Sequence, residues 1–559
     1  FPLSSLNGVK WGILGDDGLT TTGTGLDIVG SDAVLKNEFA RDILCAYRDD
    51  SPWLREVVIN TIPSKMWEGA GTAEDPYQIK TVNDLKNLQE ATTTQGLTYE
   101  NTYFKVLNDI NVGGDIGFEG IASDGNSKHE FSGIFDGNGH TIDGIVIDKC
   151  AYDANGKWTS TGSRQYCGFI GRLNAKGVIR NLTLGANTLM TLSANSGAFS
   201  GYAAGRIENC VFLGTVRGMS TTIGGIAGQV QSKGTVTGCR NDGYIISGGN
   251  NIGGIAGYNY GLVENCLNNG TVVGDSINPA HNSKSAGNYA SGIVGYLSGG
   301  TIFNCVNQGQ ISSVRVSGGI YGYTSGAVTV SGSLNTAPVQ GGQGYSFGAI
   351  GGTKPASTGK LIDNYYDSQL IPVGAVANGS HDGCTPLETA ALTNGKALAG
   401  LADSIYDYAA GMYPVLKAYK DIPSTKALRN IYMTLPTGMT VSDLTADAAL
   451  HAYDGLTWSM ADGSAAIYTI SGNTLKVGTP TQKEVQYGTV NAAIAGFTRS
   501  FGLTTVPDMF DGKGTAENPY LISTKADMLK LADLTNEEGL PYTGKHFLLC
   551  NDLDYANDT

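Results

Sequence analysis

The stretches Gly225-Ile-Ala-Gly228 and Gly254-Ile-Ala-Gly257 decide the fold, because the same four residues return after 29 positions. Variants of this glycine motif recur through the middle of the chain, at 168–171, 197–201, 292–295, 319–322 and 348–351. The last glycines of successive motifs lie 27 to 30 residues apart, except for one interval of 38 residues, which contains a polar insertion within 275–289. A fixed period of this length is typical of repeat proteins, whose units bury their apolar faces by stacking on one another.

A second motif, with an asparagine or glycine before a small or apolar residue, follows most of the glycine motifs. It reads Ile207-Glu-Asn209-Cys210, and its counterparts end at Leu182, Cys239, Cys266, Cys305 and Tyr365. Short runs of Ile, Val and Thr lie between the Gly and Asn residues without a 3.6-residue period, which predicts strands. We expect about three short strands per repeat, joined by bends whose Gly and Asn residues adopt φ > 0. Each repeat is then one rung of a parallel β-helix, with rungs about 4.8 Å apart.

The cysteines of the second motif fall at one equivalent position on successive rungs. Leu182, Ser333 and Tyr365 take that position elsewhere, which favours a packing role over a metal or disulfide ladder. Nine Cys in 559 residues, without a CxxC pair and with six scattered His, do not indicate a disulfide framework. We therefore expect no metal site and no cofactor.

Residues 67–111 and 510–554 align without a gap at a constant offset of 443. Residues 81–88 of the first copy predict a short amphipathic helix, with Thr81 as N-cap and Asp84 in the first turn. Such a helix would cap the open sheet edge at the start of a β-helix. The second copy predicts that another β-helix begins near 510, so we expect the chain to be a piece of a longer polypeptide.

Alternating Thr, Val and Ile runs precede each copy, together with Trp11 and Trp458 respectively, and they predict β-sandwiches. The sequence thus predicts an all-β chain in four parts. These are an N-terminally incomplete sandwich over 1–64, a β-helix over 66–420 with its cap at 67–111, a sandwich over 425–507 and the start of a second β-helix over 509–559.

The two repeated motifs resemble the GLUG repeat of bacterial cell-surface proteins. The segments 71–79, 131–142 and 411–416 are similar to the usual start and close of such domains, and Trp458-Ser-Met-Ala-Asp462 resembles bacterial Ig-like domains. The resemblance covers roughly 66–418 and restarts at 509. It implies a secreted or outer membrane-attached protein, often of Bacteroides-type bacteria, that adheres to host or matrix glycans or proteins or serves as a structural rod. It implies no catalytic residues.

A net charge of −14 without a basic run argues against a nucleic-acid partner, and no apolar stretch reaches the length of a membrane-spanning helix. A polysaccharide lyase or hydrolase is the main alternative, since parallel β-helices also carry such enzymes, which need clustered carboxylates. The outward position before the Asn bend reads Arg180, Glu208, Thr237, Glu264, Phe303, Ser331 and Asp363. Carboxylates therefore do not fall on adjacent rungs there, and we expect no enzyme. A passive component of a larger surface assembly stays open.

Binding residues are expected in the insertions, because insertions into solenoids lie on loops. In 151–165, Tyr152, Trp158 and Arg164 can stack on a sugar or a peptide, and 275–289 contains His281 and Tyr289. An ordinary solvated loop is the alternative for both insertions. Tyr is plentiful, at 28 residues against 5 Trp, which suits either a glycan-contacting surface or aromatic stacks along the rod.

Overall fold

A computed structural model gives the structure of the chain. It describes residues 9–15, 18–23, 26–30, 32–35, 40–49, 51–61, 66–114, 117–149, 151–152, 158–160, 165–218, 221–274, 289–342, 344–371, 374–429, 447–450, 457–479, 485–494, 497–505, 509–536, 542 and 545–553. Two compact units contain these residues. The first comprises Phe1–Glu388, Lys396–Tyr408 and Pro414–Lys420, and the second comprises Thr389–Gly395, Ala409–Tyr413 and Asp421–Thr559.

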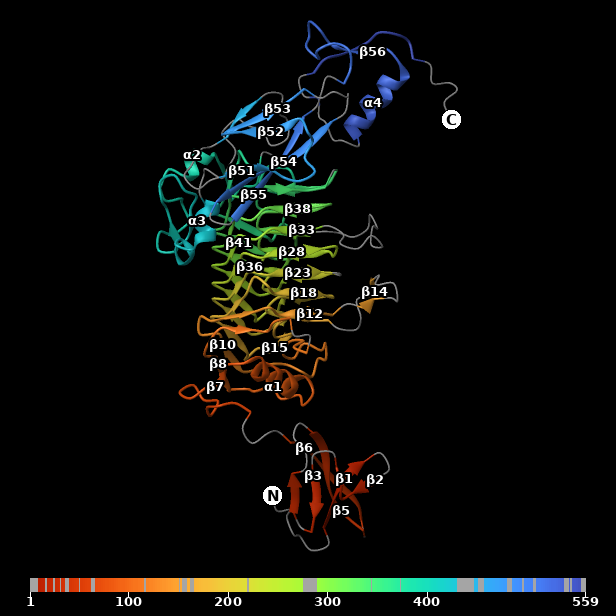
Figure 1. Cartoon of the computed structure of the whole chain (residues 1–559), viewed down its shortest axis with the longest axis vertical. Coiled ribbons are helices and arrows are strands. Elements are labelled where there is room, and N and C mark those ends of the chain that lie inside the picture. The colour runs from red at the N-terminus through yellow and green to blue at the C-terminus, as the bar shows by residue number, and fades with distance from the viewer. Residues whose placement is uncertain are drawn as a thin grey trace. The chain divides into compact units, whose positions relative to one another are not determined.

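Most of the first unit is a parallel β-solenoid, which confirms the predicted β-helix (Figure 1). One turn consists of five short strands, where the sequence predicted three, because each Gly or Asn bend interrupts a run. The strands of a representative turn are β24 (Thr222–Gly224), β25 (Ala227–Val230), β26 (Thr235–Thr237), β27 (Arg240–Asn241) and β28 (Tyr244–Ser247). Each strand pairs in parallel with its counterparts in the neighbouring turns.

Five parallel sheets result, numbered here in the order in which a turn visits them. Sheet 1 contains β19 (Ser196–Gly197), β24, β29 (Asn251–Gly253), β34 (Tyr289–Ser291), β39 (Val316–Gly318) and β44 (Phe347–Gly348). Sheet 2 contains β15 (Arg172–Leu173), β20 (Ser200–Ala203), β25, β30 (Ala256–Asn259), β35 (Val294–Ser298) and β40 (Tyr321–Ser325). Sheet 3 has ten strands from β7 (Tyr77–Ile79) to β45 (Lys360–Ile362), sheet 4 ten from β9 (Ile110–Asn111) to β47 (Cys384–Leu387), and sheet 5 seven from β12 (Val146–Asp148) to β43 (Val339–Gln340).

The bend residues of the second motif and those of the glycine motif are required for different physical reasons. Asn209, Gly238 and Asn265 of the second motif have φ of 51°, 61° and 52°, as predicted. The prediction of φ > 0 is wrong for the glycine motif, whose φ angles are not positive. A Cβ on Gly225 or Gly254 would lie less than 3.0 Å from a backbone oxygen of the following turn. These glycines are therefore required by close packing between turns.

The solenoid interior combines an apolar core with two ordered columns. Cys210, Cys239, Cys266 and Cys305 are buried, and each thiol points at the carbonyl oxygen two residues before it, at 3.2 to 3.4 Å. A buried asparagine ladder, which was not predicted from the sequence, lies two positions after this cysteine column. In it, the Nδ2 of each residue donates to the Oδ1 of the next at 2.8 Å, and its members are Asn241, Asn268, Asn307 and Asn335.

The predicted cap helix is present as α1 (Val82–Thr93), five residues longer at its end than predicted. Thr81 and Asp84 form a capping box, in which the Asp84 amide donates to Thr81 Oγ1 at 3.2 Å. In the second unit, α4 (Lys525–Asn536) begins in the same way, with the Asp527 amide donating to Thr524 Oγ1 at 3.1 Å. The geometry thus repeats at the offset of 443 seen in the sequence.

The segment after the last turn lies along the side of the solenoid and not only at its end. The Tyr406 hydroxyl donates to the Gly332 carbonyl at 2.5 Å, and the Tyr419 hydroxyl to the Asn265 carbonyl at 3.5 Å. Leu267, Val306 and Leu334 alternate with the asparagine ladder and so face away from it, yet they are fully buried. The part of the chain that contains Tyr406 and Tyr419 therefore covers this apolar side of sheet 4.

The remaining strands pair antiparallel, except that β56 (Tyr520–Ile522) pairs in parallel with β57 (Phe547–Leu549) in the second unit. In the first unit β2 (Gly18–Thr20), β1 (Lys10–Gly15), β5 (Ala40–Arg48) and β6 (Ser51–Thr61) form one sheet, and β3 (Leu26–Val29) pairs with β4 (Asp32–Leu35). In the second unit, β50 (Ala448–Ala449), β53 (Thr474–Val477) and β52 (Tyr468–Ser471) form one sheet, and β51 (Thr457–Met460), β54 (Gln486–Ile494) and β55 (Phe497–Thr505) another. Leu475, Val490 and Phe501 of these two sheets share one core. The Ig-like class and the domain limits stay predictions.

Candidate binding face

Both predicted binding insertions follow a strand of sheet 5, since 151–165 comes after β12 and 275–289 comes after β33 (Val272–Gly274). Tyr152 and Trp158 are paired positions of the small hairpin β13 (Ala151–Tyr152) and β14 (Trp158–Ser160). Their side chains, and the whole of Arg164 and His281, lie outside the described residues. Tyr289 is the first residue of β34 and is partly exposed. Of the five predicted residues, the structure brings only Tyr289 into a described cluster.

That cluster is a row of partly exposed tyrosines on sheets 1 and 2. Tyr258, Tyr296 and Tyr323 occupy one register position on β30, β35 and β40. Their ring centroids are 4.4 Å apart in the first pair and 4.9 Å in the second. Tyr260 stacks on Tyr258 at 4.4 Å, and Tyr289 lies 4.7 Å from Tyr323. These five residues are called the tyrosine face below.

The repeat itself positions this row. On each short strand of sheet 2 the neighbours of the tyrosine are buried, as Gly257 and Asn259 are beside Tyr258. The tyrosine is therefore the side chain that each turn presents outward on this sheet. A sequence signal exists for it, because Gly257, Gly295 and Gly322, the last glycines of three motifs, are each followed by Tyr. Because binding residues were expected in the insertions, Tyr289 is the one member of this cluster that was predicted.

Hydroxyl contacts hold the rings in place. The Tyr296 hydroxyl donates to Ser325 Oγ at 3.0 Å, and Ser325 Oγ donates to Ser298 Oγ at 3.0 Å. Burial is the main cause that raises the pKa of the Tyr258, Tyr289 and Tyr296 phenols, so all three are neutral at pH 7. The face can therefore stack on a ligand and exchange neutral hydrogen bonds with it.

On the turns that precede Tyr258, the same register position of sheet 2 carries residues of different chemistry. Gln229 and then Tyr202 precede Tyr258, and the Gln229 amide donates to Asn195 Oδ1 at 2.8 Å. The Arg172 guanidinium lies 4.2 Å from the centroid of the Tyr202 ring and pairs with Glu130 at 3.1 Å. The row of tyrosines in mutual contact is thus bounded by amide and ionic side chains at this end.

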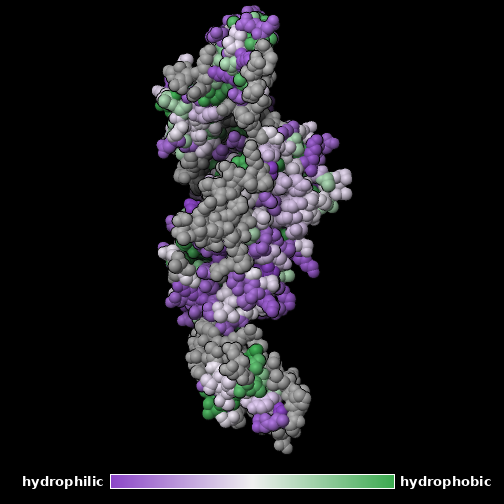
Figure 2. All heavy atoms as spheres, turned by 90° about the vertical axis from the view of Figure 1, so that its right-hand side faces the viewer, coloured by the Kyte–Doolittle hydropathy of each residue, from purple (hydrophilic) through white to green (hydrophobic). Residues whose placement is uncertain are grey.

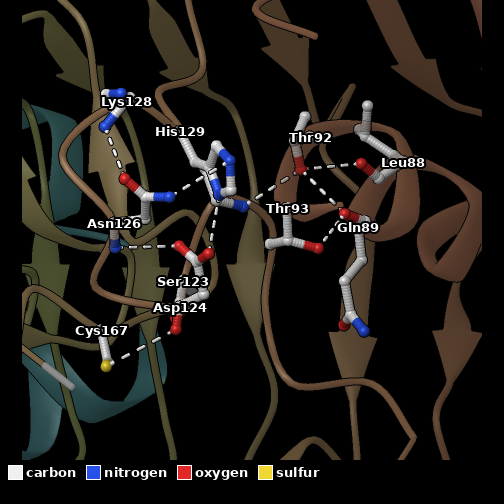
Figure 3. Close-up of polar contacts among 11 residues, drawn as sticks. Leu88, Gln89, Thr92, Thr93, Ser123, Asp124, Asn126, Lys128, His129 and Cys167 are labelled. Carbon is white, nitrogen blue, oxygen red and sulfur yellow. Dashed lines mark hydrogen bonds and ion pairs between the residues drawn. The ribbon is translucent and has the colours of Figure 1, made fainter. Parts of the chain in front are cut away.

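A histidine and a carboxylate lie together near the cap helix (Figure 3). His129 Nδ1 is 2.7 Å from Asp124 Oδ2, and the Asn126 amide is 3.3 Å from Nε2 of the same ring. Both ring nitrogens are thus engaged within one loop. Thr92 of α1 accepts the Ala122 amide of that loop at 3.1 Å. The arrangement secures the loop to the cap helix and leaves neither ring nitrogen to activate a nucleophile.

The outward row of sheet 3 bears on the alternative of an enzyme. The Asp136 carboxylate accepts from Arg180 Nε at 2.9 Å, and Glu208 on the following turn pairs with Arg206. At the other end of the row Ile362, and not the predicted Asp363, pairs with Ser331, because Asp363 forms the bend. Among the described turns, carboxylates in this row do not stand next to one another. The described residues also contain no cluster of three or more His, Cys, Asp or Glu that could hold a metal ion.

The fold and this face define a parallel β-solenoid with an outward row of aromatic side chains. No known protein-family model matches the chain. It is 31% identical to halomucin of Haloquadratum walsbyi over 172 residues. The aligned region covers 30% of this chain and 2% of that protein. The chain is 30% identical to a putative Gly-rich membrane protein of Evansella cellulosilytica over 145 residues. This aligned region covers 25% of this chain and 15% of that protein. The chain thus spans a small part of each relative. None of the described helices is long and apolar enough to cross a membrane.

Proposed function

We propose that this chain is a non-enzymatic rod of an extracellular surface protein and adheres to glycans or proteins of a host or matrix through its tyrosine face. The similarity to halomucin and to a putative Gly-rich membrane protein supports a surface-type protein. The resemblance to GLUG-repeat proteins with Ig-like modules points in the same direction. The observation that carries the proposal is the row of five contacting, partly exposed tyrosines.

The solenoid suits such a face because it presents the rings in a fixed arrangement. The strands β30 and β35 are paired on both sides within sheet 2, so the backbone beneath the face is rigid. Tyrosine has few rotatable bonds, and its phenol combines an apolar body with a polar tip. Little conformational entropy is then lost when a ligand binds, and more of the contact energy remains as affinity.

An array of glycans and matrix proteins, probed with the whole chain, tests the proposal. We expect binding that falls about tenfold or more in the triple variant Tyr258→Ala, Tyr296→Ala, Tyr323→Ala, since each ring contributes about 0.5–1.5 kcal/mol. Tyr244→Ala is the matched control, because it removes an exposed tyrosine on sheet 5 and should leave binding unchanged. A Tyr152→Ala, Trp158→Ala variant tests the predicted insertion in parallel.

The alternatives give different outcomes in the same samples. Loss of binding in the insertion variant alone would move the site to 151–165. Release of reducing or unsaturated sugar ends would contradict a non-enzymatic role and indicate a β-helix lyase or hydrolase. Absence of both binding and release would leave a passive component of a surface assembly.

A further inference from the structure

The tyrosine face has the geometry of a site for a thread-like ligand. Its rings follow one another along the direction in which the turns stack, and neighbouring turns of such a solenoid are about 4.8 Å apart. Tyr258, Tyr296 and Tyr323 repeat on three consecutive turns, and Tyr260 and Tyr289 contact this row from the side, from the turns of Tyr258 and Tyr296 respectively. A ligand that contacts every ring must therefore be extended and must offer a similar contact at each turn.

We infer that the tyrosine face binds a neutral glycan chain that lies along the solenoid axis, with about one sugar per turn. This inference rests on the proposed function and names the ligand class of the same site. A pyranose ring has an apolar face of C–H bonds and a rim of hydroxyls. The phenol rings offer the complementary apolar surface, and the Tyr296, Ser325 and Ser298 hydroxyls offer neutral hydrogen-bonding partners.

The charge of the face favours a neutral chain. All five side chains are uncharged at neutral pH, and the whole chain carries −14. An anionic polymer would be repelled at long range, and among the described residues it would meet Arg315, which acts on Tyr289 and lies 5.0 Å from the centroid of the Tyr345 ring. Such a polymer would therefore find no repeating cation along the described rings.

Two protein partners fit the face less well. An extended peptide that adds a strand needs a free sheet edge, whereas β30 and β35 are paired on both sides and β40, the last strand of sheet 2, is bridged through Tyr321 to Gly351. A globular partner needs about 800 Å² per side with an apolar centre, whereas this face presents one tyrosine per turn on sheet 2, with Tyr260, Tyr289 and serines beside the row. Figure 2 views the molecule from the side at which the strands of sheet 5 end in Figure 1, where the described residues are mostly hydrophilic or near neutral.

Calorimetric titration of the whole chain with cello-, xylo- and chito-oligosaccharides of two to six sugars tests the inference. We expect the affinity for at least one series to rise about threefold to tenfold with each sugar until the row is covered. Tyr296→Ala, in the middle of the row, should lower the affinity for the longest member about tenfold, whereas Tyr296→Phe keeps the ring and should lower it less. Tyr244→Ala should change nothing, and thermal unfolding verifies that each variant is folded.

Two results would overturn the inference. One is equal affinity for the shortest and longest members of every series, and the other is equal loss in the Tyr244→Ala and Tyr296→Ala variants. Immobilised matrix proteins, measured with the same variants, separate this failure from that of the proposed function. If the chain binds a matrix protein through Tyr296 but binds no oligosaccharide, the glycan ligand is refuted and the adhesive role of the tyrosine face is supported. No binding to either would refute both proposals.

Discussion

Replacing Gly254 by alanine should destabilise the central turns of the solenoid by at least about 3 kcal/mol. A Cβ at this position would lie less than 3.0 Å from the Gly292 carbonyl oxygen of the following turn and from the Asn268 side chain. Neither can retreat easily, because the Gly292 amide donates to the Gly319 carbonyl at 3.1 Å and Asn268 belongs to the asparagine ladder. Since the turns stack, strain at one glycine must separate two turns.

Urea unfolding followed by far-ultraviolet circular dichroism, together with hydrogen exchange of peptides from 250–310, measures this effect. Gly299→Ala is the matched control, since Gly299 has φ of +69° and no atom of its surroundings lies within 4 Å of the position that a Cβ would take. Backbone strain alone should lower the stability of that variant by about 1–2 kcal/mol. Equal losses for the two variants would mean that the turns are not packed as closely as described.

Replacing Asn268 by alanine should lower the free energy of unfolding by about 2–5 kcal/mol. Asn268 Oδ1 accepts from Asn241 at 2.8 Å, and its Nδ2 donates to Asn307 Oδ1 at 2.8 Å and to the Gly270 carbonyl at 2.9 Å. The substitution removes these bonds inside a fully buried column. Each buried polar group that loses its partner reduces the stability by about 1–3 kcal/mol.

The same unfolding experiment measures this loss, with Asn250→Ala as the control. Asn250 is exposed on a neighbouring stretch of the solenoid, so its replacement should change the stability by no more than about 0.5 kcal/mol. A change in Asn268→Ala as small as that would show that the ladder contributes little to the stability of the solenoid.

The sequence predicted the stacking of the turns and the cap because both depend on spacing and local chemistry. The glycine period gives the turns, and Thr81 with Asp84 gives the start of α1. The number of strands per turn was wrong because the strands of sheet 4 have only two to four residues, too few to show an alternating pattern. Without strand limits the inward Asn268 could not be distinguished from an outward one, and the ladder was missed.

The side contacts and the tyrosine face were missed for another reason. Tyr406 and Tyr419 bond to carbonyls 74 and 154 residues away, and nothing local in the sequence indicates such partners. Tyr258 and Tyr296 lie 38 residues apart in sequence and 4.4 Å apart as rings, because an insertion lengthens that one turn. Only the register of sheet 2 brings these residues into one row.

Nitration of the whole chain by tetranitromethane, mapped by peptide mass spectrometry with and without the cello-, xylo- or chito-oligosaccharide that binds most tightly, tests the central claim most directly. If the tyrosine face is the binding surface, the oligosaccharide protects Tyr258, Tyr296 and Tyr323 from nitration, while Tyr244 on sheet 5 reacts as before. Equal nitration of these four tyrosines with and without bound oligosaccharide would contradict the account.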